Sequence, residues 1–241
     1  MNLWTDIRDF LFPRLCLSCG KKLLQSEDGL CISCFSSLPY THLGNTSGNE
    51  MEKCFDWSSD VCSSDLFWGR FPVVRASSLF YYAKGGDVAQ ILYAMKYHAR
   101  KKLCCKMGEY MAGELCDSGF FEGIDYLLPV PLFSSRLRQR GYNQSELLAR
   151  GISRVTGIPL CTDAVVRSRN NATQTHKSGY ARWQNVDRLF LSTPHAANLH
   201  DKHILLVDDV LTTGATLVAC ADALLGVENI KISVLTLAWA R

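Results

Sequence analysis

The segment 204–216 constrains this chain most, because three local signals follow one another in it. An aliphatic run ends in Asp208 and Asp209, and a loop of small and hydroxyl residues then leads into a helical pattern. A buried strand that ends in two carboxylates, a turn and a helix N-terminus are the simplest interpretation. Gly214 would let the loop backbone approach a phosphate closely. The two acids would repel that phosphate, so they suit the binding of sugar hydroxyls instead. The residues expected around the phosphate are Thr212, Thr213, Gly214, Ala215 and Thr216.

Segments of strand and helix character alternate from about residue 72 onward. Strands are predicted over 76–82, 124–130, 163–167, 188–191, 203–207 and 230–238. Helices are predicted over 88–96, 103–116, 145–155 and 216–225. Such alternation predicts an α/β fold, with a parallel sheet covered by helices on both faces. We therefore expect one α/β domain over residues 72–241.

Four cysteines near the N-terminus form two C-x2-C pairs, Cys16/Cys19 and Cys31/Cys34, with eleven residues between the pairs. This spacing is typical of a four-thiolate zinc site, in which each pair forms a tight knuckle and a hairpin returns the chain between them. So short a unit buries little core, so we expect residues 1–40 to be a small zinc ribbon held by its metal. Four unrelated thiols and a redox C-x-x-C are the alternatives, and no strand–helix pattern surrounds either pair to favour the redox motif.

Residues 41–71 have no apolar period and are interpreted as a linker. Gly, Ser and Asn gather near 44–49, and Ser-Ser-Asp occurs twice between 58 and 65. The stretch Asp-Val-Cys-Ser-Ser-Asp-Leu within it resembles the translation of a sequencing-library adapter. We therefore hypothesise that residues 57–66 are a sequencing-adapter artefact, which sequencing of the source locus would test.

Basic residues are concentrated in the middle of the chain. Residues 131–188 contain ten Lys and Arg against three acids, a charge of +7, whereas the rest carries −4. This segment predicts a polyanionic partner, either a phosphorylated metabolite or nucleic acid, unless it is only a solvated surface. No apolar run approaches the roughly 18–20 residues that cross a bilayer, and the N-terminus lacks a signal-peptide pattern. We therefore expect a cytoplasmic protein without a membrane span, whose eleven cysteines are thiols or metal ligands.

The segment 204–216 resembles the ribose-phosphate signature of the type I phosphoribosyltransferases, which bind phosphoribosyl pyrophosphate (PRPP) together with Mg²⁺. Residues 128–145 resemble the strand and loop that receive pyrophosphate in this superfamily, and residues 167–178 resemble its mobile lid. The resemblance implies that Asp208 and Asp209 are the catalytic pair that holds the ribose hydroxyls, and that the 212–216 loop holds the 5′-phosphate. The residues implied for pyrophosphate and the lid are Arg138, Arg140, Gly141, Asn143, Gln144 and Lys177.

Together with the four cysteines, these segments resemble the ComF family of competence-associated proteins. The resemblance covers about residues 1–40 and 67–241. It includes Met95-Lys96-Tyr97, where the family's frequent Leu-Lys-Tyr-x-Gly motif has Gly in place of Ala99. It implies a part in natural competence and DNA uptake, with incoming single-stranded DNA handled beside a helicase partner.

Three functions stay open at this point. The first is a phosphoribosyltransferase domain that binds PRPP or ribose 5-phosphate and acts in DNA uptake. The second is a single-stranded DNA-binding accessory protein with a catalytically silent fold, and the third is a phosphoribosyltransferase of metabolite salvage. No segment resembles the hood that selects a nucleobase in this superfamily, so the acceptor is undefined.

Overall fold

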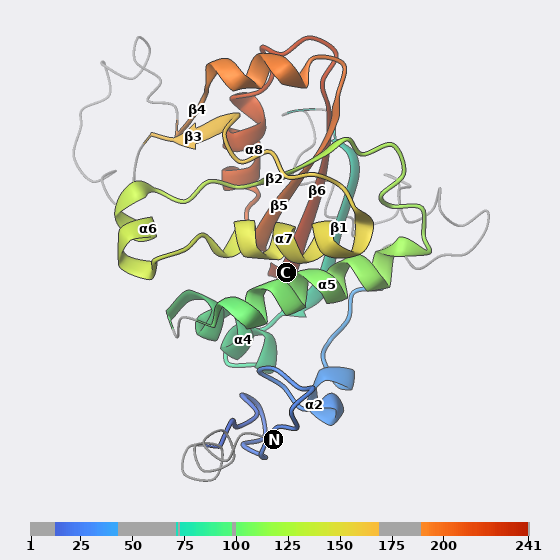
Figure 1. Ribbon diagram of the computed structural model, residues 1–241, viewed down its shortest axis with the longest axis vertical. Coiled ribbons are helices and arrows are strands. Elements are labelled where there is room, and N and C mark those ends of the chain that lie inside the picture. Colours follow the sequence, from blue (N-terminus) through green and yellow to red (C-terminus); the bar gives the residue numbers. More distant parts are fainter. Residues whose placement is uncertain (1–12, 43–70, 72, 98–99, 169–188, 241) are drawn as a thin grey trace.

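The computed structural model describes residues 13–42, 71, 73–97, 100–168 and 189–240 (Figure 1). Lys177 and residues 57–66, which carry two of the sequence predictions, lie outside the described residues.

A four-stranded parallel sheet in the order β1-β6-β5-β2 forms the centre of the molecule (Figure 1). Its strands are β1 (Val73–Tyr82), β6 (Lys231–Ala240), β5 (His203–Leu211) and β2 (Tyr126–Pro129). Residues 204–207 of β5 and 232–239 of β6 are all buried, because both faces of the sheet are covered. The parallel strands bring their carboxyl ends to one edge of the sheet, where ligands bind in open α/β sheets.

Helices pack on both faces of the sheet (Figure 1). The helices on one face are α4 (Asp87–Tyr97), α5 (Lys101–Cys116) and α7 (Gln144–Thr156). The elements on the other face are α8 (Ala215–Asp222), the 3₁₀ helix η2 (Pro194–Leu199), β3 (Val165–Arg167) and β4 (Phe190–Ser192). Alternate residues of β5 divide between the two cores: Leu205 and Val207 face the α4–α5–α7 side, and Ile204 and Leu206 face the α8 side.

Helix α7 is fixed at its N-terminus and along its length. The Asn143 side chain caps it by accepting a hydrogen bond from the Ser145 N–H at 3.1 Å. Gly151 of α7 and Gly108 of α5 let the two backbones meet. A Cβ at Gly151 would lie 2.0 Å from the Cys105 carbonyl oxygen. This close contact fixes α7 against α5, and α7 also packs on β5.

The first cysteine pair lies in a hairpin turn. Leu15 and Lys22 form an antiparallel bridge, and the Cys16 N–H donates to the Lys21 carbonyl at 2.8 Å. Gly20 turns the chain with φ at +72°, a conformation that favours glycine. The second pair differs from the predicted knuckle, because Cys31 caps a short helix, α2 (Ile32–Ser36), that contains Cys34.

The four-cysteine unit packs on the main domain. Leu23, Leu30 and Leu38 belong to the same buried cluster as the residues of α4 and α5. The chain that follows α2 adds to the outer edge of β1, where Tyr40 forms an antiparallel bridge with Phe80. The unit therefore covers an edge of the sheet that would otherwise present unpaired backbone groups.

The predicted α/β class, with a parallel sheet between helices and a small N-terminal cysteine unit, is confirmed. Most predicted elements differ from the observed ones only at their ends, as for the helix predicted over 88–96 and found at Asp87–Tyr97. Two local predictions were wrong. Strand β5 does not end at the acid pair but continues to Leu211, and the expected loop after β2 contains a helix, α6 (Ser134–Arg140).

Candidate functional site

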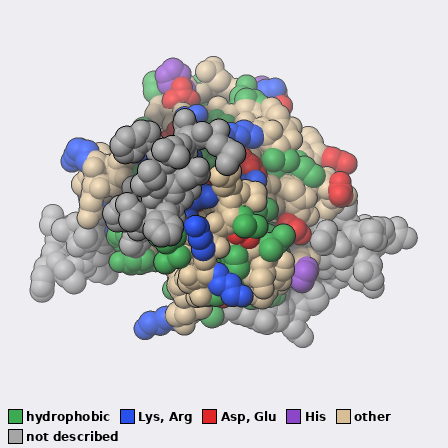
Figure 2. All heavy atoms as spheres, turned by 60° about the horizontal axis from the view of Figure 1, so that its bottom comes forward, with side chains coloured by type: hydrophobic (Ala, Val, Ile, Leu, Met, Phe, Trp, Pro, Cys, Tyr) green, Lys and Arg blue, Asp and Glu red, His purple; other side chains and the backbone are tan. Residues whose placement is uncertain are grey.

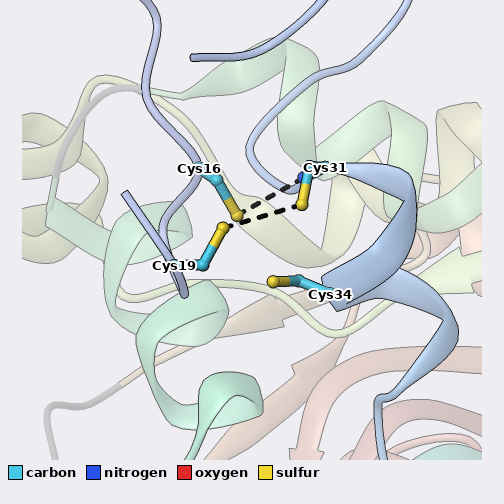
Figure 3. A group of neighbouring side chains, drawn as sticks. All are labelled: Cys16, Cys19, Cys31 and Cys34. Atoms are coloured by element: carbon cyan, nitrogen blue, oxygen red, sulfur yellow. Dashed lines mark hydrogen bonds between the residues drawn. The ribbon is translucent and has the colours of Figure 1, made fainter. Parts of the chain in front are cut away.

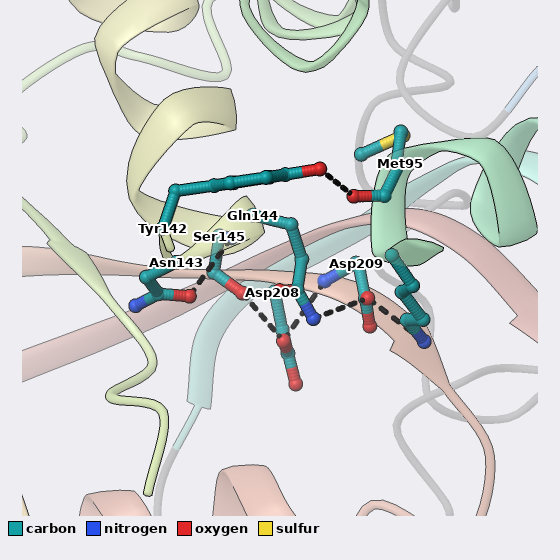
Figure 4. A network of polar contacts seen from close by, with 8 residues as sticks. Met95, Tyr142, Asn143, Gln144, Ser145, Asp208 and Asp209 are labelled. Atoms are coloured by element: carbon teal, nitrogen blue, oxygen red, sulfur yellow. Dashed lines mark hydrogen bonds and ion pairs between the residues drawn. The ribbon is translucent and has the colours of Figure 1, made fainter. Parts of the chain in front are cut away.

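The acid pair lies near the carboxyl end of β5, beside the N-terminus of α7 (Figure 4). Asp209 is buried and its Oδ2 accepts two hydrogen bonds. Lys96 Nζ at the end of α4 lies 2.9 Å from it, and Gln144 Nε2 at the start of α7 lies 3.1 Å from it. Three elements far apart in the sequence therefore converge on one carboxylate.

Asp208 has different partners. Its Oδ1 accepts hydrogen bonds from the Ser145 hydroxyl and from the Asp209 N–H, each at 2.9 Å (Figure 4). Burial and the neighbouring charge of Asp209 raise the pKa of Asp208 to about 7, although these two hydrogen bonds and the charge of Lys96 act in the opposite direction. Asp208 therefore changes its charge near neutral pH.

The loop after β5 leads into α8 as expected. Gly214 caps that helix with φ at +71°, in the left-handed region. Thr212 and Thr216 line a pocket in front of the acid pair. Thr213 does not line it, and its hydroxyl accepts from the Ala215 N–H at 3.5 Å instead. The loop thus places two of its three predicted hydroxyls at the pocket.

The pocket is open to solvent, spans about 680 Å³ with its open mouth included, and has both acids in its lining. Three arginines also line it: Arg136 and Arg140 of α6, and Arg167 at the end of β3. Burial and the nearby charge of Arg136 lower the pKa of Arg167, and the buried Arg167 Nε has no hydrogen-bond partner in the described part of the chain. Two neighbouring guanidinium groups of this kind favour an anion with several oxygens between them.

The predicted pyrophosphate residues are distributed differently from the expectation. Arg140, Asn143 and Gln144 line the pocket, whereas Arg138 is exposed outside it. Gly141 was expected to permit close approach, but a Cβ there would meet nothing within 4 Å. It ends α6 in the left-handed conformation, with φ at +75°.

Asn143 has a structural task as well as a place at the pocket. Its side chain caps α7 and donates from Nδ2 to the Val130 carbonyl at 3.0 Å. From the sequence, Arg136 and Ser145 belong to the segment expected to receive pyrophosphate and Arg167 to the expected lid, but no pattern connected these residues or Lys96 with the acid pair. The sequence signals were the Lys-Tyr segment at 95–97 and the two basic segments at 128–145 and 167–178. None of the three indicates which side chain turns toward the pocket.

The four cysteines form a second candidate site (Figure 3). The Sγ atoms of Cys16, Cys19, Cys31 and Cys34 all lie within 4.8 Å of one another, and those of Cys19 and Cys31 are 3.7 Å apart. Four sulfurs at the usual Zn–S distance of about 2.3 Å in a tetrahedron lie about 3.8 Å apart. The cluster therefore has the composition and size to bind a metal such as zinc.

Backbone groups around Cys16 prepare its sulfur for a metal. Burial opposes ionisation, but hydrogen bonds from the backbone N–H groups of Cys19, Cys31 and Ser18 outweigh it and lower the pKa of the Cys16 thiol to about 6. None of the nine cysteines in the described residues forms a disulfide. Within the same residues, no helix has both the length and the apolar character to cross a membrane.

Comparison with known proteins defines the class. Residues 142–240 match the family model of the phosphoribosyl transferase domain, which covers the start of α7, the acid pair and the 212–216 loop. A purine phosphoribosyltransferase from Pyrococcus horikoshii Ot3 aligns at 17% identity and a TM-score of 0.35, over 56% of this chain and 74% of that one. The family match therefore indicates a domain of the phosphoribosyl transferase type over residues 142–240.

Curated relatives define the family further. The DNA utilization protein YhgH of Shigella flexneri is 27% identical over 88% of this chain and 91% of its own length. Competence protein F of Haemophilus influenzae is 26% identical over 90% of this chain and 94% of its own. Competence protein ComFC of Bacillus subtilis is 35% identical over 41% of this chain and 38% of its own. The chain is thus similar over most of its length to proteins named for DNA utilization and competence, which fits the resemblance to the ComF family.

Proposed function

We propose that the pocket binds PRPP, or the related ribose 5-phosphate, in front of β5. The acid pair accepts hydrogen bonds from the two ribose hydroxyls, since carboxylates are acceptors only. The 5′-phosphate lies at the 212–216 loop, where Thr212 and Thr216 line the pocket and the N-terminus of α8 offers backbone N–H groups.

The arginines suit the diphosphate of the same ligand. Arg136 and Arg167 lie close enough to depress the pKa of the Arg167 guanidinium, and an anion between them relieves that repulsion. Arg140 adds a third cation at the pocket. Arg136 and Arg167 thus bind the diphosphate in place of Arg138, for which the family resemblance implied this role. Lys177, for which the same role was implied, lies outside the described residues.

The chemistry of such a site is mainly positioning and charge neutralisation. Bound with PRPP, Mg²⁺ would supply further neutralisation of the departing pyrophosphate, and the carboxylate oxygens of Asp208 and Asp209 are ligands of the hard type it prefers. Lys96 and Gln144 fix the Asp209 carboxylate, and Ser145 fixes that of Asp208. The acceptor that would receive the ribose is not defined by these residues.

We also propose a part in natural competence and the use of DNA, in the cytoplasm. The printed names of the relatives, DNA utilization protein and Competence protein F, support this part. A helicase partner, implied by the family resemblance, is part of the same proposal. The cysteine cluster would bind Zn²⁺ and hold residues 13–42 in place, because these residues contribute few buried side chains of their own.

One observation carries the pocket assignment: the acid pair, the hydroxyl loop and three arginines of distant elements all face one space. Isothermal titration with Mg·PRPP tests it. We expect binding by the intact protein and an affinity at least about 100-fold weaker after Asp208→Asn with Asp209→Asn, since hydrogen bonds to charged groups contribute about 1.5–3 kcal/mol each. Asp222→Asn, an exposed site on α8, is the matched control. Equal affinities of the double variant and the intact protein would contradict the assignment.

A screen with labelled PRPP then separates the catalytic alternatives. Transfer of the ribose to one nucleobase or amine would indicate a salvage enzyme. Binding without transfer to any acceptor would indicate a catalytically silent fold. This result would favour the second function, a DNA-binding accessory protein.

A further inference from the structure

The Lys96–Asp209 ion pair differs from the other ion pairs in the described part of the chain. Basic and acidic side chains are scattered over the face shown in Figure 2, where water screens their charges. By contrast, the side chains of Lys96 and Asp209 are only 23% and 7% exposed, the lowest values of any ion pair between described residues. A carboxylate buried to this extent needs a compensating charge, so Lys96 is the counter-ion of Asp209.

One ammonium group serves two adjacent carboxylates. Lys96 Nζ lies 2.9 Å from Asp209 Oδ2, whereas the groups that donate to Asp208 are neutral, the Ser145 hydroxyl and the Asp209 N–H. With both acids ionised, the lysine and the two acids carry a net charge of −1 instead of −2. Gln144 Nε2 donates to the same Asp209 oxygen, so two donors already share the oxygen that a metal ion would need.

The residues on either side of Lys96 fix its position. The Met95 carbonyl accepts a hydrogen bond from the buried Tyr142 hydroxyl (Figure 4). The Arg140 guanidinium lies over the ring of Tyr97, 5.4 Å from its centroid. These two contacts tie the last turn of α4 to the segment between α6 and α7. The ammonium group of Lys96 is therefore held beside the acid pair.

A divalent cation would compete with Lys96 for this place. Two adjacent carboxylates without a counter-ion offer Mg²⁺ the oxygen ligands that it prefers, at about 2.0–2.1 Å. An ammonium group at hydrogen-bond distance from one of these oxygens occupies that oxygen and repels the cation. Because Mg²⁺ gives up its own water reluctantly, a pair of acids that keeps only one net negative charge binds it weakly.

We propose that Lys96 excludes free divalent cations from the acid pair, so that the pocket admits Mg²⁺ only together with an anionic ligand. The diphosphate of such a ligand supplies the negative charge that Lys96 has cancelled at Asp209. Lys96 is thus a residue that determines the cation specificity of the pocket. The exclusion of the free ion does not rest on PRPP binding, and only its use for Mg·PRPP rests on the proposed function.

Isothermal titration of the full-length protein with MgCl₂ alone tests the proposal. We expect Lys96→Gln to bind Mg²⁺ at least about 10-fold more tightly than the intact protein, because the change removes a positive charge next to the metal position. Lys96→Arg keeps the charge and should bind Mg²⁺ within about threefold of the intact protein. Adding Asp208→Asn to Lys96→Gln should abolish the gain, which would place the bound ion at the acid pair.

Lys202→Gln is the matched control, since Lys202 pairs with Asp125 at the amino end of the sheet, and it should leave the Mg²⁺ affinity unchanged. If Lys96→Gln unfolds without its counter-ion, Mg²⁺ should restore its melting temperature, because a ligand stabilises the state that binds it. The proposal is overturned if Lys96→Gln shows neither tighter Mg²⁺ binding nor this rescue, or if the intact protein binds free Mg²⁺ equally well. Failure of PRPP to bind would contradict the pocket assignment and leave this inference standing.

Discussion

The two candidate sites are built in opposite ways. The cysteine cluster takes all four of its ligands from residues 16–34, and local turns bring them together. The pocket takes its side chains from α4, α6, α7, β3, β5 and the loop before α8, and only the packed sheet brings these together. A metal can therefore assemble the first site, whereas the second forms only when the whole domain is folded.

The difference extends to what stabilises each region. The cysteine unit has a short helix and few buried leucines, so we expect its structure to depend on a metal held by the four cysteines. The pocket depends on the contact of α5 with α7, because α7 carries Gln144 and Ser145 to the acid pair. A substitution that destabilises one of the two regions should therefore leave the structure of the other intact.

Loss of one cysteine ligand should have the largest effect. We expect Cys16→Ser or Cys31→Ser to abolish a zinc content of about one per chain and to lower the free energy of unfolding by on the order of 5 kcal/mol, because metal binding is folding energy in small metal sites. Metal analysis and urea unfolding measure both. Cys116→Ser, at an exposed cysteine outside the cluster, is the control. It should leave the zinc content unchanged and should change the free energy of unfolding by no more than about 0.5 kcal/mol. A stable, metal-free Cys16→Ser protein would show that packing alone holds the unit.

A methyl group between α5 and α7 should have the next largest effect, and it should act on the pocket. Gly151→Ala places a Cβ 2.0 Å from a backbone oxygen and 2.9 Å from the Gly108 Cα, neither of which can turn away. We expect a loss of about 3 kcal/mol in the free energy of unfolding, with weaker PRPP binding and unchanged zinc content.

The control for this change is Gly113→Ala on α5. Gly113 is exposed and an added Cβ would meet nothing within 4 Å, so alanine should be neutral or stabilise the helix by up to about 1 kcal/mol. If both glycine variants unfold at the same urea concentration, the close contact between α5 and α7 is not what holds α7 beside the acid pair.

The same contrast explains what the sequence could predict. The cysteine spacing and the Asp208-Asp209 block are local patterns, so the sequence pointed directly to the four cysteines that lie together and to the two acids that line the pocket. Strands and helices with a clear apolar pattern were also predicted. Strand β6 is an example, because its buried residues form one continuous apolar run. Helix α6 was missed because its sequence, Ser-Ser-Arg-Leu-Arg-Gln-Arg, has one apolar residue and no side-chain cap.

The pocket cations show where local patterns stop. Arg136, Arg138 and Arg140 alternate along one basic segment, and only the helical path of α6 decides that Arg136 and Arg140 face the pocket while Arg138 does not. Lys96 reaches Asp209 because α4 ends beside β5, a tertiary relation that no spacing encodes. Which side chains of a segment converge on a site thus depends on packing between elements.

The smallest expected effect concerns the pH dependence of stability. Burial raises the pKa of Asp208 to about 7, above its ordinary value of 3.8. Between about pH 4 and pH 7 the folded protein therefore holds a proton that the unfolded chain has released, and raising the pH over this range lowers the free energy of unfolding. We expect a loss on the order of 1–2 kcal/mol, less than the full shift implies, because the Asp208 residue as a whole is only half-buried.

Urea unfolding at pH 5 and pH 8 measures this loss when the intact protein is compared with Asp208→Asn, which does not titrate. As the pH rises, the free energy of unfolding of the variant should increase relative to that of the intact protein. The zinc content of the two proteins should be the same. If the two proteins show the same change between pH 5 and pH 8, Asp208 titrates at its ordinary value. The hydrogen bond from Ser145 and the charge of Lys96 would then offset its burial beside Asp209, and Asp208 would carry its charge at every physiological pH.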